Sequence, residues 1–209
     1  PGLALIVQVS GSHKSGAATA NGVSPDGIII SGLKGPDQAA DLKDALSDTI
    51  WGIRTDALSA EDAKAYEEGG SGVLAFQMKG TSLGAVSSED SATVLCIEAD
   101  MDIEDLRDIN ALPVDAVLFP LAGASSSWTL DDLAKVSRIS GRLGKYLFAE
   151  ITEPPSAEDL KVLRTAGING LVLDVSVGKE ILESFKKTLM EMPKPGSEKS
   201  GKSNAILPG

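Results

Sequence analysis

Two stretches of this chain, 97 residues apart, carry nearly the same sequence. Ser-Ala-Glu-Asp at residues 59–62 leads to Gly69, and the same four residue types at 156–159 lead to Gly167. A serine followed three residues later by an acidic residue is typical of a helix start, and glycine is typical of a helix end. Apolar, β-rich runs flank both stretches, at residues 50–55, 73–78, 146–152 and 171–175. A strand, a capped helix, a glycine and a second strand form a βαβ unit, so the sequence predicts parallel strands joined by helices.

The same alternation runs through most of the chain. The β-rich runs lie at residues 3–10, 27–32, 49–55, 73–78, 93–99, 116–121, 146–152 and 171–175. Most of them are apolar at both alternating positions, as expected for parallel strands covered on both faces. Helical segments are predicted between them, at residues 37–46, 59–69, 102–111, 129–143, 156–167 and 178–192.

Two connections break this rhythm. Residues 11–25 carry no apolar stripe and are interpreted as a loop with at most a short alanine-rich turn, and residues 79–91 leave room only for a brief helix near 88–91. We therefore expect reduced helices after strands 1 and 4. Residues 193–209 are rich in Pro, Gly, Ser and Lys and are predicted to form a flexible or loosely docked tail, which leaves residues 1–192 as one domain.

Eight strands with helical crossovers form either an open, doubly wound sheet or a closed barrel. The number of strands and their regular spacing favour the barrel. Residues 3–192 resemble a compact (β/α)8, or TIM, barrel, and the two similar stretches then lie half a barrel apart. The resemblance implies an active site at the carboxyl ends of the strands, but no motif points to one enzyme family.

Composition limits the classes of partner. The net charge of −11 and the absence of a Lys/Arg cluster interleaved with aromatic residues argue against nucleic-acid binding. The apolar runs are too short to span a bilayer, so no membrane association is predicted. Cys96, the only cysteine, is interpreted as a buried core thiol and fits a cytoplasmic protein. A homo-oligomer is compatible with the sequence.

Four charged residues stand at similar depth near the ends of otherwise apolar strands: Arg54, Glu98, Glu150 and Asp174. If all four point inward, repulsion among the three carboxylates is expected to raise at least one carboxyl pKa, as a general acid or base requires. We predict Glu98, Glu150 and Asp174 as catalytic and Arg54 as substrate-binding. The alternatives are a structural ion network, or three carboxylates holding a hard divalent cation, although no metal site is assigned.

Three further residues are predicted to contact the substrate. Gln77 lies at the end of the fourth strand, and Ser176 and Lys179 lie between the eighth strand and the last helix. This last loop is the usual phosphate position in TIM barrels. The loop after the seventh strand contains Glu153 and two prolines, which disfavour an anion, so capping of the last helix is the competing interpretation.

Two functions remain open. The first is a small-molecule-binding barrel, an enzyme of the lyase, isomerase or hydrolase type that uses acid–base chemistry on a small polar metabolite. The second is a catalytically silent barrel that serves as a scaffold or protein-interaction module. Neither the Walker P-loop, which binds nucleotide phosphates, nor the GxGxxG fingerprint of dinucleotide-binding proteins is present. The sequence therefore does not identify a cofactor.

Overall fold

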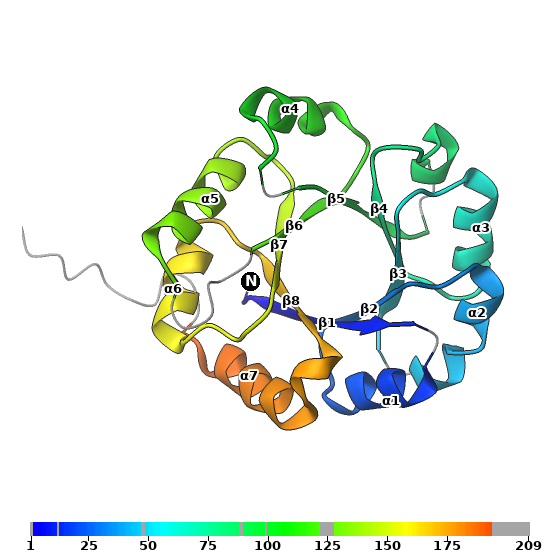
Figure 1. Cartoon of the computed structure of the whole chain (residues 1–209), viewed down its shortest axis with the longest axis horizontal. Coiled ribbons are helices and arrows are strands. Elements are labelled where there is room, and N and C mark those ends of the chain that lie inside the picture. The colour runs from blue at the N-terminus through cyan, green and yellow to red at the C-terminus, as the bar shows by residue number, and fades with distance from the viewer. Residues whose placement is uncertain are drawn as a thin grey trace, which may run out of the picture.

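A ring of parallel strands lies at the centre of the molecule and helices surround it (Figure 1). The computed structural model describes residues 2–11, 13–46, 49–87, 90–98, 100–121 and 128–193. The strands found there are β1 (Ala4–Ser10), β2 (Gly27–Ser31), β3 (Trp51–Thr55), β4 (Val73–Gln77), β5 (Ala92–Cys96), β6 (Ala116–Pro120), β7 (Tyr146–Ile151) and β8 (Gly170–Asp174). Each strand pairs in parallel with the next one in the sequence, and β8 pairs with β1. The sheet is therefore a closed eight-stranded barrel, and the predicted (β/α)8 TIM-type fold is confirmed.

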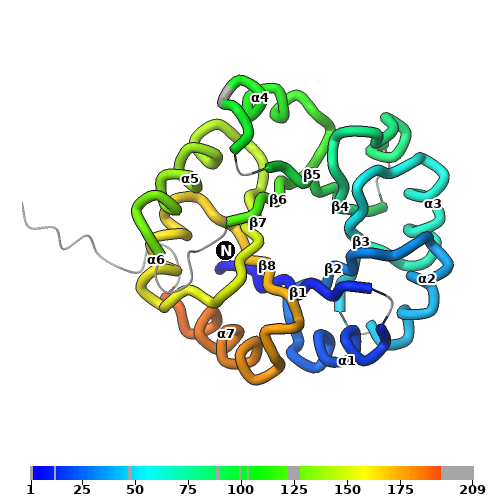
Figure 2. The backbone as a smooth tube through the Cα atoms, viewed as in Figure 1, coloured from blue at the N-terminus to red at the C-terminus, as the bar shows by residue number. Residues whose placement is uncertain are grey.

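Helices follow most of the strands and cover the outside of the barrel, as the backbone trace also shows (Figure 2). The α-helices of the described residues are α1 (Lys14–Gly22), α2 (Pro36–Ala40), α3 (Ala60–Glu68), α4 (Ile103–Asp108), α5 (Leu130–Ser140), α6 (Ala157–Thr165) and α7 (Lys179–Glu191). Short 3-10 turns add η1 (Lys43–Leu46), η2 (Leu83–Val86), η3 (Ile109–Ala111) and η4 (Val175–Val177). Within this described part, no helix combines the length and the apolar composition needed to cross a lipid bilayer.

The strands separate two hydrophobic cores. Side chains on the outer face, such as Leu5 and Leu171, pack under the helices in one large cluster of buried residues. Side chains on the inner face, such as Val94, Leu118 and Val172, form a second and much smaller cluster inside the barrel. Burial on both faces explains why most strands are apolar at every position.

The two similar stretches occupy equivalent places in the barrel. Ser59 caps α3 and accepts a hydrogen bond of 3.0 Å from the backbone N–H of Asp62. Ser156 caps α6 and accepts one of 3.2 Å from the N–H of Asp159. The units β3-α3-β4 and β7-α6-β8 thus lie half a barrel apart, as predicted.

The segment after β1 differs from the sequence-based expectation of a loop. Lys14–Gly22 forms a nine-residue α-helix, as long as α3 and α6. Its contact face consists of Ala17 and Ala20, both fully buried. Alanine side chains make a weak apolar stripe, which is why the pattern did not reveal the helix.

The connection after β4 is reduced, as expected. Its regular structure among the described residues is the single turn η2, which comes before the predicted position at 88–91. Residues 88 and 89 lie outside the described residues. The predicted tail does so too, apart from Pro193, and its separation from the barrel stays a prediction.

Candidate functional site at the carboxyl ends of the strands

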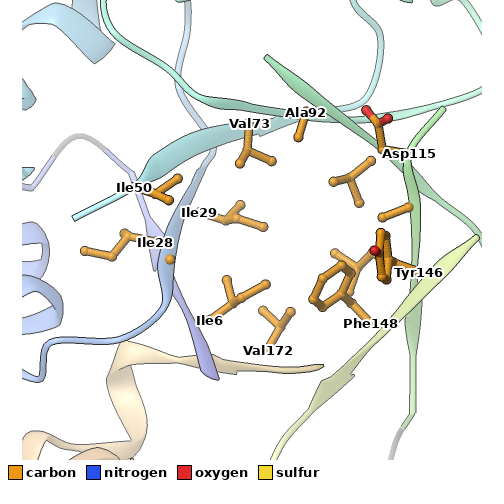
Figure 3. A pocket seen from close by; sticks show the side chains of 14 residues that line it. Ile6, Ile28, Ile29, Ile50, Val73, Ala92, Asp115, Tyr146, Phe148 and Val172 are labelled. Carbon is orange, nitrogen blue, oxygen red and sulfur yellow. The ribbon is translucent and has the colours of Figure 1, made fainter. Parts of the chain in front are cut away.

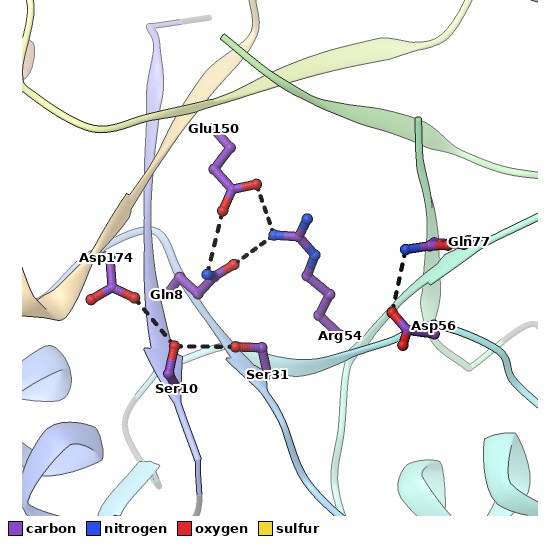
Figure 4. Close-up of polar contacts among 8 residues, drawn as sticks. All are labelled: Gln8, Ser10, Ser31, Arg54, Asp56, Gln77, Glu150 and Asp174. Atoms are coloured by element: carbon purple, nitrogen blue, oxygen red, sulfur yellow. Dashed lines mark hydrogen bonds and ion pairs between the residues drawn. The ribbon is translucent and has the colours of Figure 1, made fainter. Parts of the chain in front are cut away.

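The inner face of the barrel changes from apolar to polar toward the carboxyl ends of the strands. On β1, Ile6 is followed on the same face by Gln8, and on β7, Phe148 is followed by Glu150. Figure 4 shows the polar side chains that gather at this end. We call them the mouth cluster: Gln8, Ser10, Ser31, Arg54, Asp56, Gln77, Glu150 and Asp174. They come from six strands and the loop after β3, so the barrel brings together residues that are far apart in the sequence.

Arg54, Glu150 and Gln8 form a closed set of contacts in the middle of the mouth (Figure 4). Arg54 Nη1 donates to Glu150 Oε2 at 2.8 Å and to Gln8 Oε1 at 2.9 Å. Gln8 Nε2 completes the set with a long contact of 3.4 Å to Glu150 Oε1. The Arg54 and Glu150 side chains are 27% and 29% exposed, so the ion pair is half-buried yet reachable from solvent.

The guanidinium of Arg54 is only partly used by these contacts. Nη1 has two N–H groups, and Glu150 and Gln8 take both of them. No oxygen of a described residue accepts a hydrogen bond from Nη2 or Nε. Those two nitrogens form the edge of a guanidinium that binds a carboxylate or phosphate through two parallel hydrogen bonds.

The Cys96 thiol is a hydrogen-bond partner of the Arg54 guanidinium, and each group changes the pKa of the other. Burial raises the pKa of the Cys96 thiol to about 11, against the opposing effect of the Arg54 charge. The pKa of Arg54 is raised as well: burial alone lowers it, but the Cys96 and Glu150 groups together raise it by more. Because the thiol is neutral at pH 7, Glu150 is the charged partner of Arg54 under ordinary conditions.

Asp174 uses its two oxygens locally. Oδ1 accepts a hydrogen bond of 2.9 Å from the N–H of Ser176 and so caps η4. Oδ2 accepts a long one of 3.4 Å from Ser10 Oγ, which also lies 3.4 Å from Ser31 Oγ. These hydroxyl groups and the half-buried carboxylate form a polar rim beside the Arg54 group.

The remaining predicted site residues lie farther out. Gln77 is exposed at the end of β4, and its side-chain amide donates to Asp56 at 3.3 Å. Glu98 is exposed because β5 ends two residues earlier, at Cys96. The structure therefore does not place Glu98 beside Arg54, and among the described residues Glu150 is the carboxylate that forms an ion pair with it.

The loop after β8 gives no cluster of positive charge at the mouth. Ser176 is exposed, and Lys179 lies at the start of α7, where its ammonium is 3.5 Å from Glu183 in the next turn. Gly178 precedes α7 with φ of 101°, a backbone conformation that favours glycine, and provides no side-chain cap. The competing interpretation was that this loop caps the last helix. The structure shows a side-chain cap on η4, from Asp174, and none on α7.

The two neighbours of Arg54 other than Glu150 were not among the predicted site residues, and neither were Ser10, Ser31 and Asp56 of the mouth cluster. Gln8 links Arg54 to Glu150, and Cys96 lies beside Arg54 although it was interpreted as an ordinary core thiol. Both stand on the inward face of their strands, two residues beyond an apolar inward residue. This alternation was the signal available in the sequence, but neither side chain carries a formal charge that draws attention to it.

The arrangement offers anion binding and proton exchange. Among the described residues, no group of three or more His, Cys, Asp or Glu side chains is arranged to hold a metal ion. The described residues provide a partly exposed guanidinium with a neutral thiol and a carboxylate beside it, and several hydroxyl and amide groups around them.

Comparison with known proteins gives the fold alone. No protein-family model and no curated protein matches the sequence. Among solved structures, the chain is similar to thiamine phosphate pyrophosphorylase from Pyrococcus furiosus, with a TM-score of 0.65 and 11% identity over 91% of this chain and 96% of that one. It is also similar to 3-hexulose-6-phosphate synthase, with a TM-score of 0.64 and 16% identity over 90% and 98%. An HpcH/HpaI aldolase/citrate lyase family protein from Burkholderia cenocepacia has a TM-score of 0.63 and 14% identity over 91% and 94%. All three are TIM-barrel proteins, and at such low identity they support the architecture without a particular reaction.

Proposed function

We propose that the mouth cluster binds a small polar metabolite that carries a carboxylate or phosphate group, and that Glu150 exchanges a proton with it. The observation that carries this proposal is the partly exposed Arg54 guanidinium, whose Nη1 donates to Gln8 and Glu150 while no oxygen of a described residue accepts from Nη2 or Nε. A guanidinium held by Gln8 and Glu150 has little freedom left, so an anion meets a donor pair that is already oriented.

Glu150 has a double part in this proposal. Its carboxylate fixes Arg54, and it lies beside any group that the arginine holds, within reach of a proton on the bound molecule. Asp174, with Ser10 and Ser31, forms the polar rim beside Arg54 and is suited to hydrogen-bond hydroxyl groups of the ligand. A catalytic role for Glu98, and roles for Gln77, Ser176 and Lys179 as substrate contacts, stay predictions.

The solved structures agree with this class of function. Thiamine phosphate pyrophosphorylase and 3-hexulose-6-phosphate synthase are both named after phosphorylated compounds. The third similar protein belongs to an aldolase/citrate lyase family. Such enzymes use the carboxyl ends of the barrel strands for binding and catalysis. These likenesses support a small-molecule enzyme but not a particular substrate.

A screen with matched variants tests the proposal. Wild type, Arg54→Met and Arg107→Met are compared by thermal shift against a panel of carboxylated and phosphorylated metabolites. Arg107 is an exposed arginine on α4 and is the control for the loss of one positive charge. We expect ligands that stabilise the wild type and Arg107→Met but not Arg54→Met. If every stabilising anion acts equally on all three proteins, the proposed site is wrong.

The scaffold alternative has lost one of its supports. A reduced helix after strand 1, as expected from the sequence, would leave part of the barrel uncovered for a partner, but α1 covers that part. The thin cover after β4 remains, where Leu83 of η2 is 86% exposed and Met78 is 50% exposed. Light scattering coupled to size exclusion tests this alternative: a strict monomer with an anion site at the mouth contradicts it.

A further inference from the structure

The opposite end of the barrel contains a cavity of quite different character. It has a volume of about 250 Å³ and lies inside the ring, toward the amino ends of the strands. Figure 3 shows apolar side chains converging on it from several strands. Its inner wall consists mainly of Ile6, Ile29, Val73, Phe148 and Val172.

Small residues on the inner face leave this space open. Ala92, Ala116 and Gly27 line the cavity, at positions where TIM barrels usually carry bulky, branched side chains that fill the interior. A Cβ atom added to Gly27 meets no atom closer than 3.6 Å, which is ordinary van der Waals distance. By contrast, a Cβ on Gly52, one strand further on, overlaps the Val73 carbonyl group. Glycine is thus required by packing at position 52 but not at position 27, where the chain leaves room unused.

The cavity offers almost nothing to water. Asp115 and Tyr146 are the polar side chains among its lining residues. Oδ2 of Asp115 accepts hydrogen bonds from the backbone N–H of Thr93 at 2.8 Å and from its hydroxyl at 2.9 Å, and Asp115 is exposed, so it belongs to the rim of the cavity. Tyr146 is 64% exposed, so it belongs to the rim. A buried water needs two to four polar partners, which this lining lacks, whereas an apolar ligand recovers the contacts that an empty space forfeits.

The shape of the cavity restricts its occupant. The ring of eight strands encloses it, so an α-helix, about 10 Å across with its side chains, is too wide to enter. Ile50, which is 65% exposed, and Tyr146 stand at the open end and give it an apolar border. An apolar cavity of about 150 Å³ is known to bind benzene, so the larger space here accommodates a ligand of one or two rings.

We propose that this cavity is a second binding site, separate from the polar mouth, for a small uncharged apolar molecule such as an aromatic ring system or a short hydrocarbon chain. The proposal does not depend on the function assigned to the mouth. The two sites lie at opposite ends of the same barrel and share none of the residues that define them.

Indole and toluene are suitable probes for the full chain. Isothermal titration and ligand-observed NMR are carried out on the wild type, on two variants that fill the cavity and on a control. Gly27→Val and Ala92→Leu add carbon to the lining, and the exposed position of Ala92 limits the risk to folding. Ala157→Leu makes the same change as Ala92→Leu on the exposed face of α6 and is the matched control.

We expect the wild type and Ala157→Leu to bind indole equally, and Ala92→Leu to bind it at least about tenfold more weakly, which corresponds to about 1.4 kcal/mol. Arg54→Met, at the mouth, should leave the affinity for indole unchanged. The proposal is wrong if the wild type binds neither probe. It is also wrong if Gly27→Val and Ala92→Leu both bind indole as tightly as the wild type does.

One further variant distinguishes a free ligand from a segment of the chain itself. The sequence ends in an apolar stretch that contains Ile206 and Leu207. If the wild type binds no probe but the double variant Ile206→Asp/Leu207→Asp does, the cavity holds this stretch, and the proposal of a site for a free apolar molecule is wrong. If both proteins bind indole with the same affinity, the proposal is supported.

Discussion

Cys96 illustrates how one inward-facing position changes character near the mouth. It follows the apolar Val94 on the inner face of β5 and lies beside the charged group of Arg54. A nearby guanidinium favours the thiolate, but burial has the larger effect, and the pKa of the thiol rises to about 11. Cys96 is therefore a neutral thiol at physiological pH and is not an activated nucleophile.

The raised pKa of Cys96 makes the stability of the protein depend on pH in the alkaline range. Well below pH 9.0 the thiol is protonated in both the folded and the unfolded state. Between 9.0 and about 11 the unfolded chain loses this proton while the folded protein keeps it, so the free energy of unfolding decreases as the pH rises. Denaturant titrations at neutral pH and near pH 11 should show a smaller loss for Cys96→Ala than for the wild type. Equal losses in the two proteins contradict the assignment.

The ion pair between Arg54 and Glu150 allows a second test at the level of single residues. Because the pair is partly exposed, solvent screens it, and we expect a coupling energy of up to about 1 kcal/mol in a double-mutant cycle of Arg54→Met and Glu150→Gln. Such a modest value fits a pair retained for binding. A coupling of several kcal/mol indicates instead a structural ion pair that holds the barrel together.

At the scale of elements, three side chains repeat one device at the amino ends of the strands. Each stands directly before an even-numbered strand and accepts a hydrogen bond from the backbone of the preceding odd-numbered strand. Asp26 accepts from Leu5 at 2.8 Å, Asp115 from Thr93 at 2.8 Å, and Asn169 from Leu147 at 2.7 Å. These contacts satisfy backbone donors at the edge of the barrel and tie β1 to β2, β5 to β6 and β7 to β8.

Removing one of these acceptors should weaken the barrel measurably. Asp115→Ala leaves the backbone N–H and the hydroxyl of Thr93 without their acceptor, and we expect a loss of about 1–3 kcal/mol in the free energy of unfolding. Asp108→Ala, on the exposed face of α4, is a suitable control and should change stability little. Equal effects of the two substitutions in urea denaturation contradict the assigned role.

The two serine caps provide a prediction about the half-barrel units. Ser59→Ala and Ser156→Ala each remove the acceptor at the start of a nine-residue helix, which costs about 1 kcal/mol. The caps lie in different units, so the double variant should lose the sum of the two effects. Denaturant titration of the three variants measures this, and strong non-additivity argues against independent units.

Strands and capped helices were predictable because their patterns are local, whereas the ends of elements were not. The run at 93–99 gave no sign that β5 stops at Cys96, and this early end leaves Glu98 in solvent. Helix α1 was missed because alanine packs without forming a strong apolar stripe. Arg54 pairs with Glu150 because β3 and β7 face each other across the closed barrel. This proximity arises only when the whole barrel forms, so no local sequence pattern reveals it.

At the scale of the whole molecule, the barrel has two chemically different ends. The carboxyl ends of the strands carry charged and hydroxyl groups around Arg54, while the amino ends surround an apolar cavity. The protein as a whole carries a net charge of −11, so its electrostatic potential repels anions at long range. The anionic ligand that we propose at the mouth would therefore depend on short-range contacts, which in the proposal Arg54 makes.

The most direct test of the mouth site is to observe the guanidinium itself. The Nε–H signal of Arg54 is followed by NMR while a metabolite that stabilises the wild type in the screen is added. We expect a saturable shift of this signal and slower exchange of its proton with water, with the same dissociation constant as the thermal stabilisation gives. An Arg54 signal that stays unchanged while the metabolite still stabilises the protein contradicts the proposal that Arg54 binds the anion.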